Sequence, residues 1–239
     1  MKYYTASTKH LCGVWLIILF VSIAPLRTIA QSWKWSIGSA ITQYQFENSK
    51  GFQIDCMKPS AGLHVELAQE HVLLDTVRLI SKFSKSAIYF SNRPKLAKSL
   101  SYLQYSIGLN YHQLNAIGDV QQIAFSYQTD FVGFSLALGP KYTFYKGWNL
   151  GIAGVLMGQQ LIAGNQLLSN RYYSLTQDSQ FNSFKVFAGY QIELSKSINS
   201  NVRAFAQVRR TSSLFSPLSP TGKLDMSPMT ISMGISLNR

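Results

Sequence analysis

The stretch 229–239, MTISMGISLNR, decides the fold because two kinds of side chain alternate along it. The large apolar side chains occupy every second position, at Met229, Ile231, Met233, Ile235 and Leu237. Residues two apart share a face in a β-strand, whereas neighbours on one face of a helix are three or four apart. The stretch therefore predicts a strand with one apolar face and one face of small or polar groups.

The same alternation recurs upstream, so we expect eight such strands. The other seven segments are 33–42, 61–68, 103–112, 132–139, 148–153, 183–194 and 201–209. Their second face is rich in Gly, Ser, Ala, Gln and Asn with isolated charges, which is typical of a narrow barrel lumen rather than of a solvated sheet face. Long and short connections alternate between the later strands, as outer loops and periplasmic turns do.

The composition excludes several classes of protein. Charged residues make up 13% of the chain and hydrophobic residues 46%, which excludes intrinsic disorder as the main state. Two cysteines cannot build a disulfide scaffold or a structural zinc site. The net charge of +12 indicates an anionic partner, either nucleic acid or lipid.

The N-terminal segment decides between those partners. Residues 1–10 carry two lysines, residues 11–23 are almost wholly apolar, and the segment ends in Thr28-Ile29-Ala30. This order is typical of a secretory signal peptide, so we expect cleavage after residue 30 and a mature domain at 31–239. Attachment of a lipid anchor needs a cysteine just after the apolar run, but Cys12 lies at the beginning of the run, so we expect no lipid anchor. An exported basic protein meets outer-membrane lipid and lipopolysaccharide, and we expect no nucleic-acid partner.

The segments FVGFSLALGPKYTFYKGWNLGIAGVLMG (131–158) and KPSAGLHVEL (58–67), with the closing strands, resemble the small outer-membrane β-barrel (porin-like) family of Gram-negative bacteria. The resemblance covers nearly all of the mature chain and contains no catalytic motif. It implies an all-β, antiparallel up-and-down transmembrane β-barrel of eight strands in the outer membrane. It also implies the barrel-assembly machinery as a partner during biogenesis.

The segment at about 70–99 does not fit a short turn. Val72, Leu74, Thr76 and residues 87–90 could add a hairpin and make ten strands, whereas Leu73, Val77 and Ile80 suit one face of a helix. Its basic residues are candidates for contacting lipopolysaccharide phosphate, peptidoglycan or an acidic envelope protein: Arg78, Lys82, Lys85, Arg93, Lys95 and Lys98. The alternative is an ordinary solvated loop.

The polar face of the strands carries charges that we expect to pair inside the barrel. The predicted lumen network consists of Glu66, Lys185, Glu193, Arg203 and Arg209. Glu193 and Arg203 flank the short turn 195–200, so we expect this pair to approach first. His64 and His112 share the polar face as lumen fillers.

We expect no catalytic, cofactor or metal site, and a non-enzymatic structural or binding role at the cell envelope, carried by the loops. The alternatives are a narrow passive channel and a lipid-modifying enzyme. A barrel of eight strands leaves room for little more than its own side chains, which favours the binding role over a channel.

Overall fold

A computed structural model describes residues 32–48, 50–54, 57–74, 94–120, 123–215 and 222–238. The predicted signal peptide at 1–30, its cleavage site and Cys56 lie outside the described residues. No helix in the described ranges is long and apolar enough to cross a membrane.

Strands dominate the described chain. They are β1 (Ser32–Asn48), β2 (Gln53–Ile54), β3 (Met57–Val72), β4 (Leu103–Gln113), β5 (Asn115–Val120), β6 (Ile123–Tyr145), β7 (Trp148–Leu168), β8 (Arg171–Ser174), β9 (Lys185–Ser197), β10 (Val202–Phe215) and β11 (Gly222–Asn238). The helices are α3 (Pro94–Tyr102) and α4 (Ser179–Asn182).

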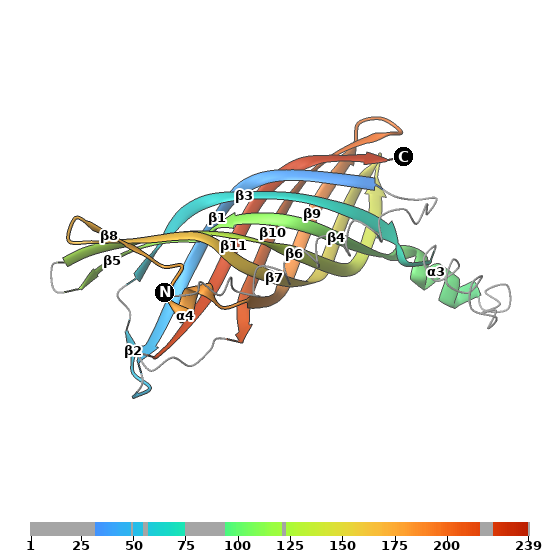
Figure 1. The fold of residues 1–239 in the computed structure, drawn as a ribbon. Helices are drawn as coiled ribbons and strands as arrows, with labels where there is room; N and C mark the ends of the chain where they lie inside the picture. Colours follow the sequence, from blue (N-terminus) through green and yellow to red (C-terminus); the bar gives the residue numbers. More distant parts are fainter. Residues whose placement is uncertain are drawn as a thin grey trace, which may run out of the picture.

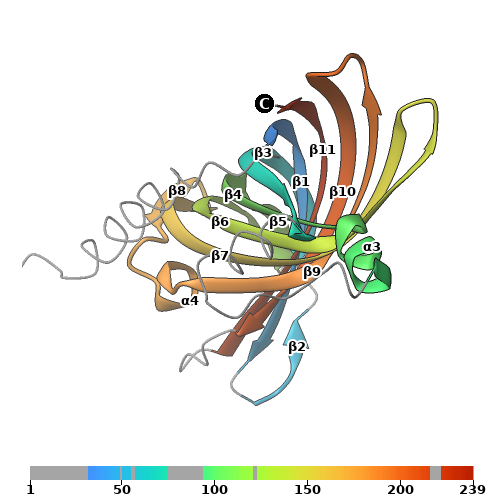
Figure 2. The same cartoon turned by 90° about the vertical axis from the view of Figure 1, so that its right-hand side faces the viewer.

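Eight of these strands close into a ring, as Figures 1 and 2 show. The order around the ring is β1, β11, β10, β9, β7, β6, β4 and β3, and β3 pairs with β1 again. Every pair is antiparallel, and β5 continues the line of β4 between β3 and β6. This confirms the expected eight-stranded, antiparallel up-and-down barrel. The ten-stranded alternative is wrong for the described chain, because β3 and β4 are neighbours in the ring.

The register fixes the width of the barrel. Ile41 on β1 pairs directly with Ala61 on β3. If the paired residues are followed the other way around the ring, from Ile41 through the six strands between β1 and β3, they end on β3 at His71. The two β3 positions differ by ten residues, which is the stagger of the closed sheet. With ordinary strand spacings, eight strands and this stagger give a tilt of about 40° and a backbone radius of about 8 Å. Side chains fill such an interior.

Burial follows the alternation predicted from the sequence. Met233 on β11 is 68% exposed and neighbouring Ser232 is 3% exposed. On the other ring strands too, outward and inward side chains alternate, and over the segments predicted from the sequence the outward ones are mostly apolar and the inward ones mostly small or polar. An apolar exterior around a closed ladder is the arrangement that a bilayer requires, because no strand edge or polar backbone group faces lipid.

The two ends of the barrel differ. One end, here called the terminus end, holds Ser32 and Asn238, which pair with each other, and two short turns. Positive φ angles at Lys146 and Gly147 give the two-residue turn between β6 and β7 the backbone that a tight hairpin needs. The opposite end, the loop end, carries the tips of β2, β5, β6, β7 and β8 (Figure 1).

The predicted basic insertion joins β3 to β4 at the terminus end, where α3 lies (Figure 1). The strand and helix bounds place this connection after Val72 and before Leu103, slightly later than the predicted range. Lys95 and Lys98 belong to α3, and the Lys98 side chain is exposed. Arg78, Lys82, Lys85 and Arg93 lie outside the described residues, so an anionic contact by this segment stays a prediction.

Candidate functional site

The inward face of the barrel gathers most of the buried polar groups of the described chain. These groups form layers along the axis because successive inward positions on one strand are two residues apart. Glu70 lies near the terminus end of β3, and Glu66 lies four residues closer to the loop end. Apart from Lys185, the buried charges of the described lumen fall into two groups, one above the other.

The layer at the terminus end is a ring of four charges of alternating sign from β1, β3, β6 and β9. Lys141 Nζ lies 2.8 Å from Glu70 Oε1 and 2.9 Å from Glu193 Oε1. Lys34 Nζ lies 3.4 Å from Glu70 Oε2 and also donates a hydrogen bond to Glu193 Oε2. Each carboxylate thus meets two ammonium groups, so the buried charges compensate one another.

Arg203 extends this ring toward the terminus end of β10. Its Nη1 lies 3.5 Å from Glu70 Oε1, and its side chain is less buried than the other four. Lys34 also lies over the ring of Phe205, with Nζ 4.5 Å from the centroid. The aromatic face adds a favourable cation–π contact to the buried ammonium group.

The middle layer centres on the ion pair of Glu66 and Arg209. Arg209 Nη2 lies 2.8 Å from Glu66 Oε2, and it also donates to Gln191 Oε1 at 2.7 Å. Ser135 Oγ donates to Glu66 Oε1 at 2.5 Å, and Gln207 Nε2 donates to its other oxygen at 3.4 Å. The Glu66 carboxylate is therefore surrounded by donors, which offsets the cost of burying it.

Two histidines complete the middle layer. The rings of His64 and His112 are fully buried and meet edge to face, with centroids 4.3 Å apart. His64 Nε2 lies 3.8 Å from Glu66 Oε2. Among the described residues no group of three or more His, Cys, Asp or Glu side chains could hold a metal ion.

The layer nearest the loop end is apolar. Fully buried side chains meet there across the barrel: Leu114, Phe131, Met157, Phe187, Leu224 and Met226. Leu175 and Phe181, from the connection between β8 and β9, join the same cluster. Tyr44 crosses this layer, and its hydroxyl donates to the carbonyl of Leu114 at 2.7 Å. The connection therefore packs into the loop end of the barrel and helps to close it.

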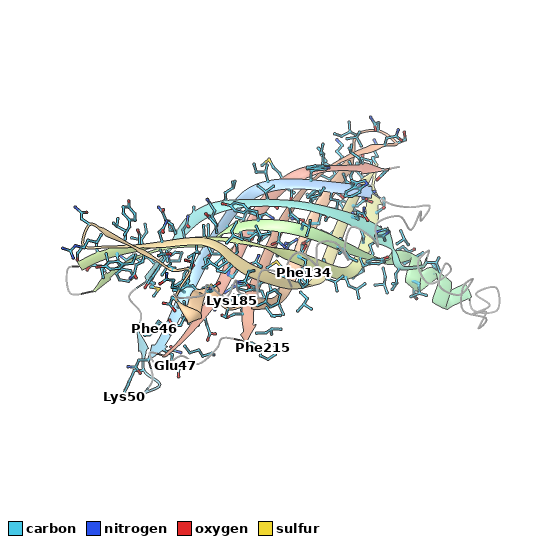
Figure 3. All side chains as sticks on the ribbon, in the orientation of Figure 1. Phe46, Glu47, Lys50, Phe134, Lys185 and Phe215 are labelled. Carbon is cyan, nitrogen blue, oxygen red and sulfur yellow. The ribbon has the colours of Figure 1, made fainter. Side chains whose placement is uncertain are left out.

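Lys185 plays a different part from the one predicted. Its side chain is fully buried, and Nζ donates to the backbone carbonyl of Gln180 in α4 rather than to a carboxylate (Figure 3). Lys185 thus holds α4 against β9. No sequence pattern indicated this contact, because the acceptor is a backbone atom of an irregular connection.

The structure does not bring together the expected pair of Glu193 and Arg203. Arg203 pairs across the ladder with Ser197, four residues from Glu193, and its guanidinium reaches Glu70. The Glu193 carboxylate forms ion pairs with Lys34 and Lys141 instead. The predicted network did not include Glu70 and Lys141. Each of them lies an even number of positions from inward residues of the same strand, so the alternation places both on the inward face.

Little space remains inside. A cavity of about 40 Å³ borders the charged ring at Lys34, Glu70, Lys141 and Glu193. A cavity of this size has room for about three water molecules. It is too small for a solute pathway, and both charged side chains and apolar ones such as Ala137 and Ile152 line it.

The comparisons with known proteins found only distant similarities. No family model and no curated protein matches the sequence. Among solved structures, the attachment invasion locus protein of Yersinia pestis is 14% identical, with 87% of this chain and 98% of that chain covered and a TM-score of 0.36. A major outer membrane protein from Thermus thermophilus is 10% identical, with 87% of this chain and 99% of that chain covered and a TM-score of 0.44. The outer membrane protease OmpT from Escherichia coli is 8% identical, with 89% of this chain and 98% of that chain covered and a TM-score of 0.39.

The chain has the architecture of a small outer-membrane β-barrel. The closed register and the apolar exterior establish this architecture, and the similarities to solved structures are too low to add to it. The similar proteins include one named for attachment and invasion and one protease, so they assign no shared activity to this chain.

Proposed function

We propose that the protein is an integral outer-membrane protein of a Gram-negative bacterium that neither conducts solutes nor catalyses a reaction, and that acts by binding at the cell envelope. The filled lumen carries the proposal. Charged side chains occupy its terminus end and its middle, and an apolar cluster occupies its loop end. A molecule crossing the barrel would have to displace all three layers.

The same packing argues against catalysis in the lumen. Ser135 and His64 both lie beside Glu66, but all three side chains are buried, and Ser135 donates its hydrogen bond to the carboxylate. A hydroxyl nucleophile needs a base that accepts its proton and a substrate within reach. Here the carboxylate is ion-paired with Arg209, and the barrel wall separates the group from lipid.

The loop end offers the surfaces for binding. Phe52 after β1, Tyr172 on β8 and Phe215 at the end of β10 are 66%, 74% and 72% exposed. In Figure 3 Phe215 lies at one tip of the barrel, toward the same end as Glu47 and Lys50. Exposed aromatic residues are enriched in protein interfaces, because they bury a large area at a small cost in conformational entropy.

Conductance in planar bilayers tests the closed lumen. The folded, purified protein should give no current steps, and the same amount of boiled protein serves as the control for leakage. Discrete steps given by the folded protein alone would contradict the proposal and establish the narrow channel. The enzyme alternative predicts a different outcome, namely a changed lipid A mass profile when the gene is deleted.

A further inference from the structure

Two adjacent arginines of β10 point to opposite sides of the barrel wall. Arg209 is buried in the lumen, where it pairs with Glu66. Arg210 therefore faces outward, and its side chain is exposed. Its position contrasts with the composition of the outward face, which is otherwise apolar in this region.

The outward neighbours of Arg210 are uncharged. Arg210 lies opposite Tyr190 on β9 and Met229 on β11, and Val208 precedes it on the same face. On the outward faces of β9, β10 and β11, the structure describes no other charged side chain between the level of Lys196 and the level of Met229. No acidic side chain of the described residues forms an ion pair with Arg210.

The register places Arg210 in the half of the barrel nearer the loops. Lys196 marks the terminus-end rim, lies 5.2 Å from the ring of Trp148, and pairs with Ala204. Arg210 lies six residues beyond Ala204 on β10. At the tilt given by the register, this spacing corresponds to about 15 Å along the barrel axis. The apolar band of such barrels is about 25 Å tall, so Arg210 faces the acyl-chain region in its loop-side half, about 10 Å from the loop-side head groups.

A lipid-facing cation at this depth needs an anionic partner. A charged side chain on the lipid face destabilises a barrel unless its charge reaches the interface or a counter-ion. The arginine side chain is long enough to extend toward the head groups, and its planar guanidinium can bind phosphate oxygens through two parallel hydrogen bonds. The neighbouring groups cannot supply the negative charge, because they are a phenol, a thioether and an aliphatic chain.

We propose that Arg210 is a binding site for the phosphate of an anionic lipid in the loop-side leaflet. Tyr190 and Met229 would lie against the acyl chains of that lipid, while the guanidinium holds its phosphate. The inference rests on the proposed membrane insertion, and it adds one specific lipid site on the wall formed by β9, β10 and β11.

Native mass spectrometry of the folded protein, titrated with lipid A or with phosphatidylglycerol, tests this site. The wild-type protein should bind one phosphate-bearing lipid about tenfold more tightly than Arg210→Gln, the effect of losing one strong charge-assisted contact. Arg210→Lys should be intermediate, because it keeps the charge but loses the planar fork. The matched control Lys196→Gln, at the opposite rim, should keep the wild-type affinity for that site.

The outcomes separate the claims. Tighter binding of lipid A identifies lipopolysaccharide as the source of the phosphate, and equal binding identifies any phosphate-bearing lipid. Equal affinities of the wild type and Arg210→Gln, with both proteins folded and inserted in vesicles, would overturn the inference and leave the proposed function standing. A change in oligomeric state without a change in lipid affinity would also overturn it, in favour of an interface between copies. Failure of the wild type to insert would contradict the proposed function itself.

Discussion

At the scale of single residues, parity along a strand decides whether a charge meets the lumen or the membrane. Glu66 and Glu70 on β3 both point inward because they are four positions apart, and each meets cations from other strands. Arg209 and Arg210 are one position apart, so their environments differ completely. In a barrel this narrow, burying an inward charge costs too much free energy unless a compensating partner lies close to it.

The pair of Glu66 and Arg209 should therefore show strong coupling. Either Glu66→Gln or Arg209→Gln leaves the other charge buried without its partner and should destabilise the fold by about 3–5 kcal/mol. The double variant should recover part of that loss. The midpoint of heat-dependent unfolding in lipid, followed by gel mobility, measures each step. The partly exposed pair of Lys223 and Asp225 at the loop end is the control, for which each loss should stay below about 1 kcal/mol.

A second double-mutant cycle distinguishes the observed partner of Glu193 from the predicted one. Glu193 Oε1 lies 2.9 Å from Lys141, whereas Arg203 reaches Glu70. Glu193→Gln and Lys141→Gln should be coupled more strongly than Glu193→Gln and Arg203→Gln in the same unfolding measurement. Stronger coupling with Arg203 would mean that the order of the charges in the ring is wrong.

At the scale of the strand, the two ends of the outward face should respond differently to the same substitution. Met233→Lys puts an ammonium group near the middle of the outward apolar face and should cost about 2–4 kcal/mol. Phe215→Lys, outward at the loop end of β10, should cost at most about 1 kcal/mol, because it lies beyond the hydrocarbon. Unfolding midpoints in vesicles test this difference. Equal tolerance at the two positions would show that the outward face does not contact lipid.

The strands were predictable from the sequence because period-two alternation is a local signal. It located every strand of the ring and the inward side of each, as Met233 and Ser232 illustrate. The bounds were less predictable, since β6 runs over 23 residues and β7 over 21, well beyond their apolar alternation. Hydrogen bonding to neighbouring strands carries both strands past the membrane to the loop end, and a single segment contains no information about its neighbours.

The partners of the lumen charges could not be predicted, because they depend on register. The four charges of the terminus-end ring come from four different strands, and the ten-residue stagger of the closed ring brings them together. They are Lys34, Glu70, Lys141 and Glu193. Chain proximity suggested Glu193 and Arg203, but Arg203 pairs with Ser197 across the ladder, so the two residues lie four positions apart along their strands. Lys185 escaped prediction for a similar reason, since α4 supplies its acceptor.

At the scale of the whole molecule, the barrel combines an apolar exterior with a filled interior. Closure without free edges in the ring should make the folded protein resist SDS at room temperature and migrate differently after boiling. Gel electrophoresis of heated and unheated samples provides this measurement. Identical mobility would indicate that the ring of strands does not persist as a closed unit in the detergent.

The most direct test of the central claim, that the outward face lies in a bilayer, uses the tryptophans as depth probes. Trp33, Trp35 and Trp148 all lie on the outward face toward the terminus end. In vesicles of phosphatidylcholine brominated on the acyl chains, tryptophan fluorescence should be strongly quenched relative to vesicles of the unbrominated lipid. Fluorescence that is the same in both lipids, from protein with the mobility of the folded state, would contradict the account.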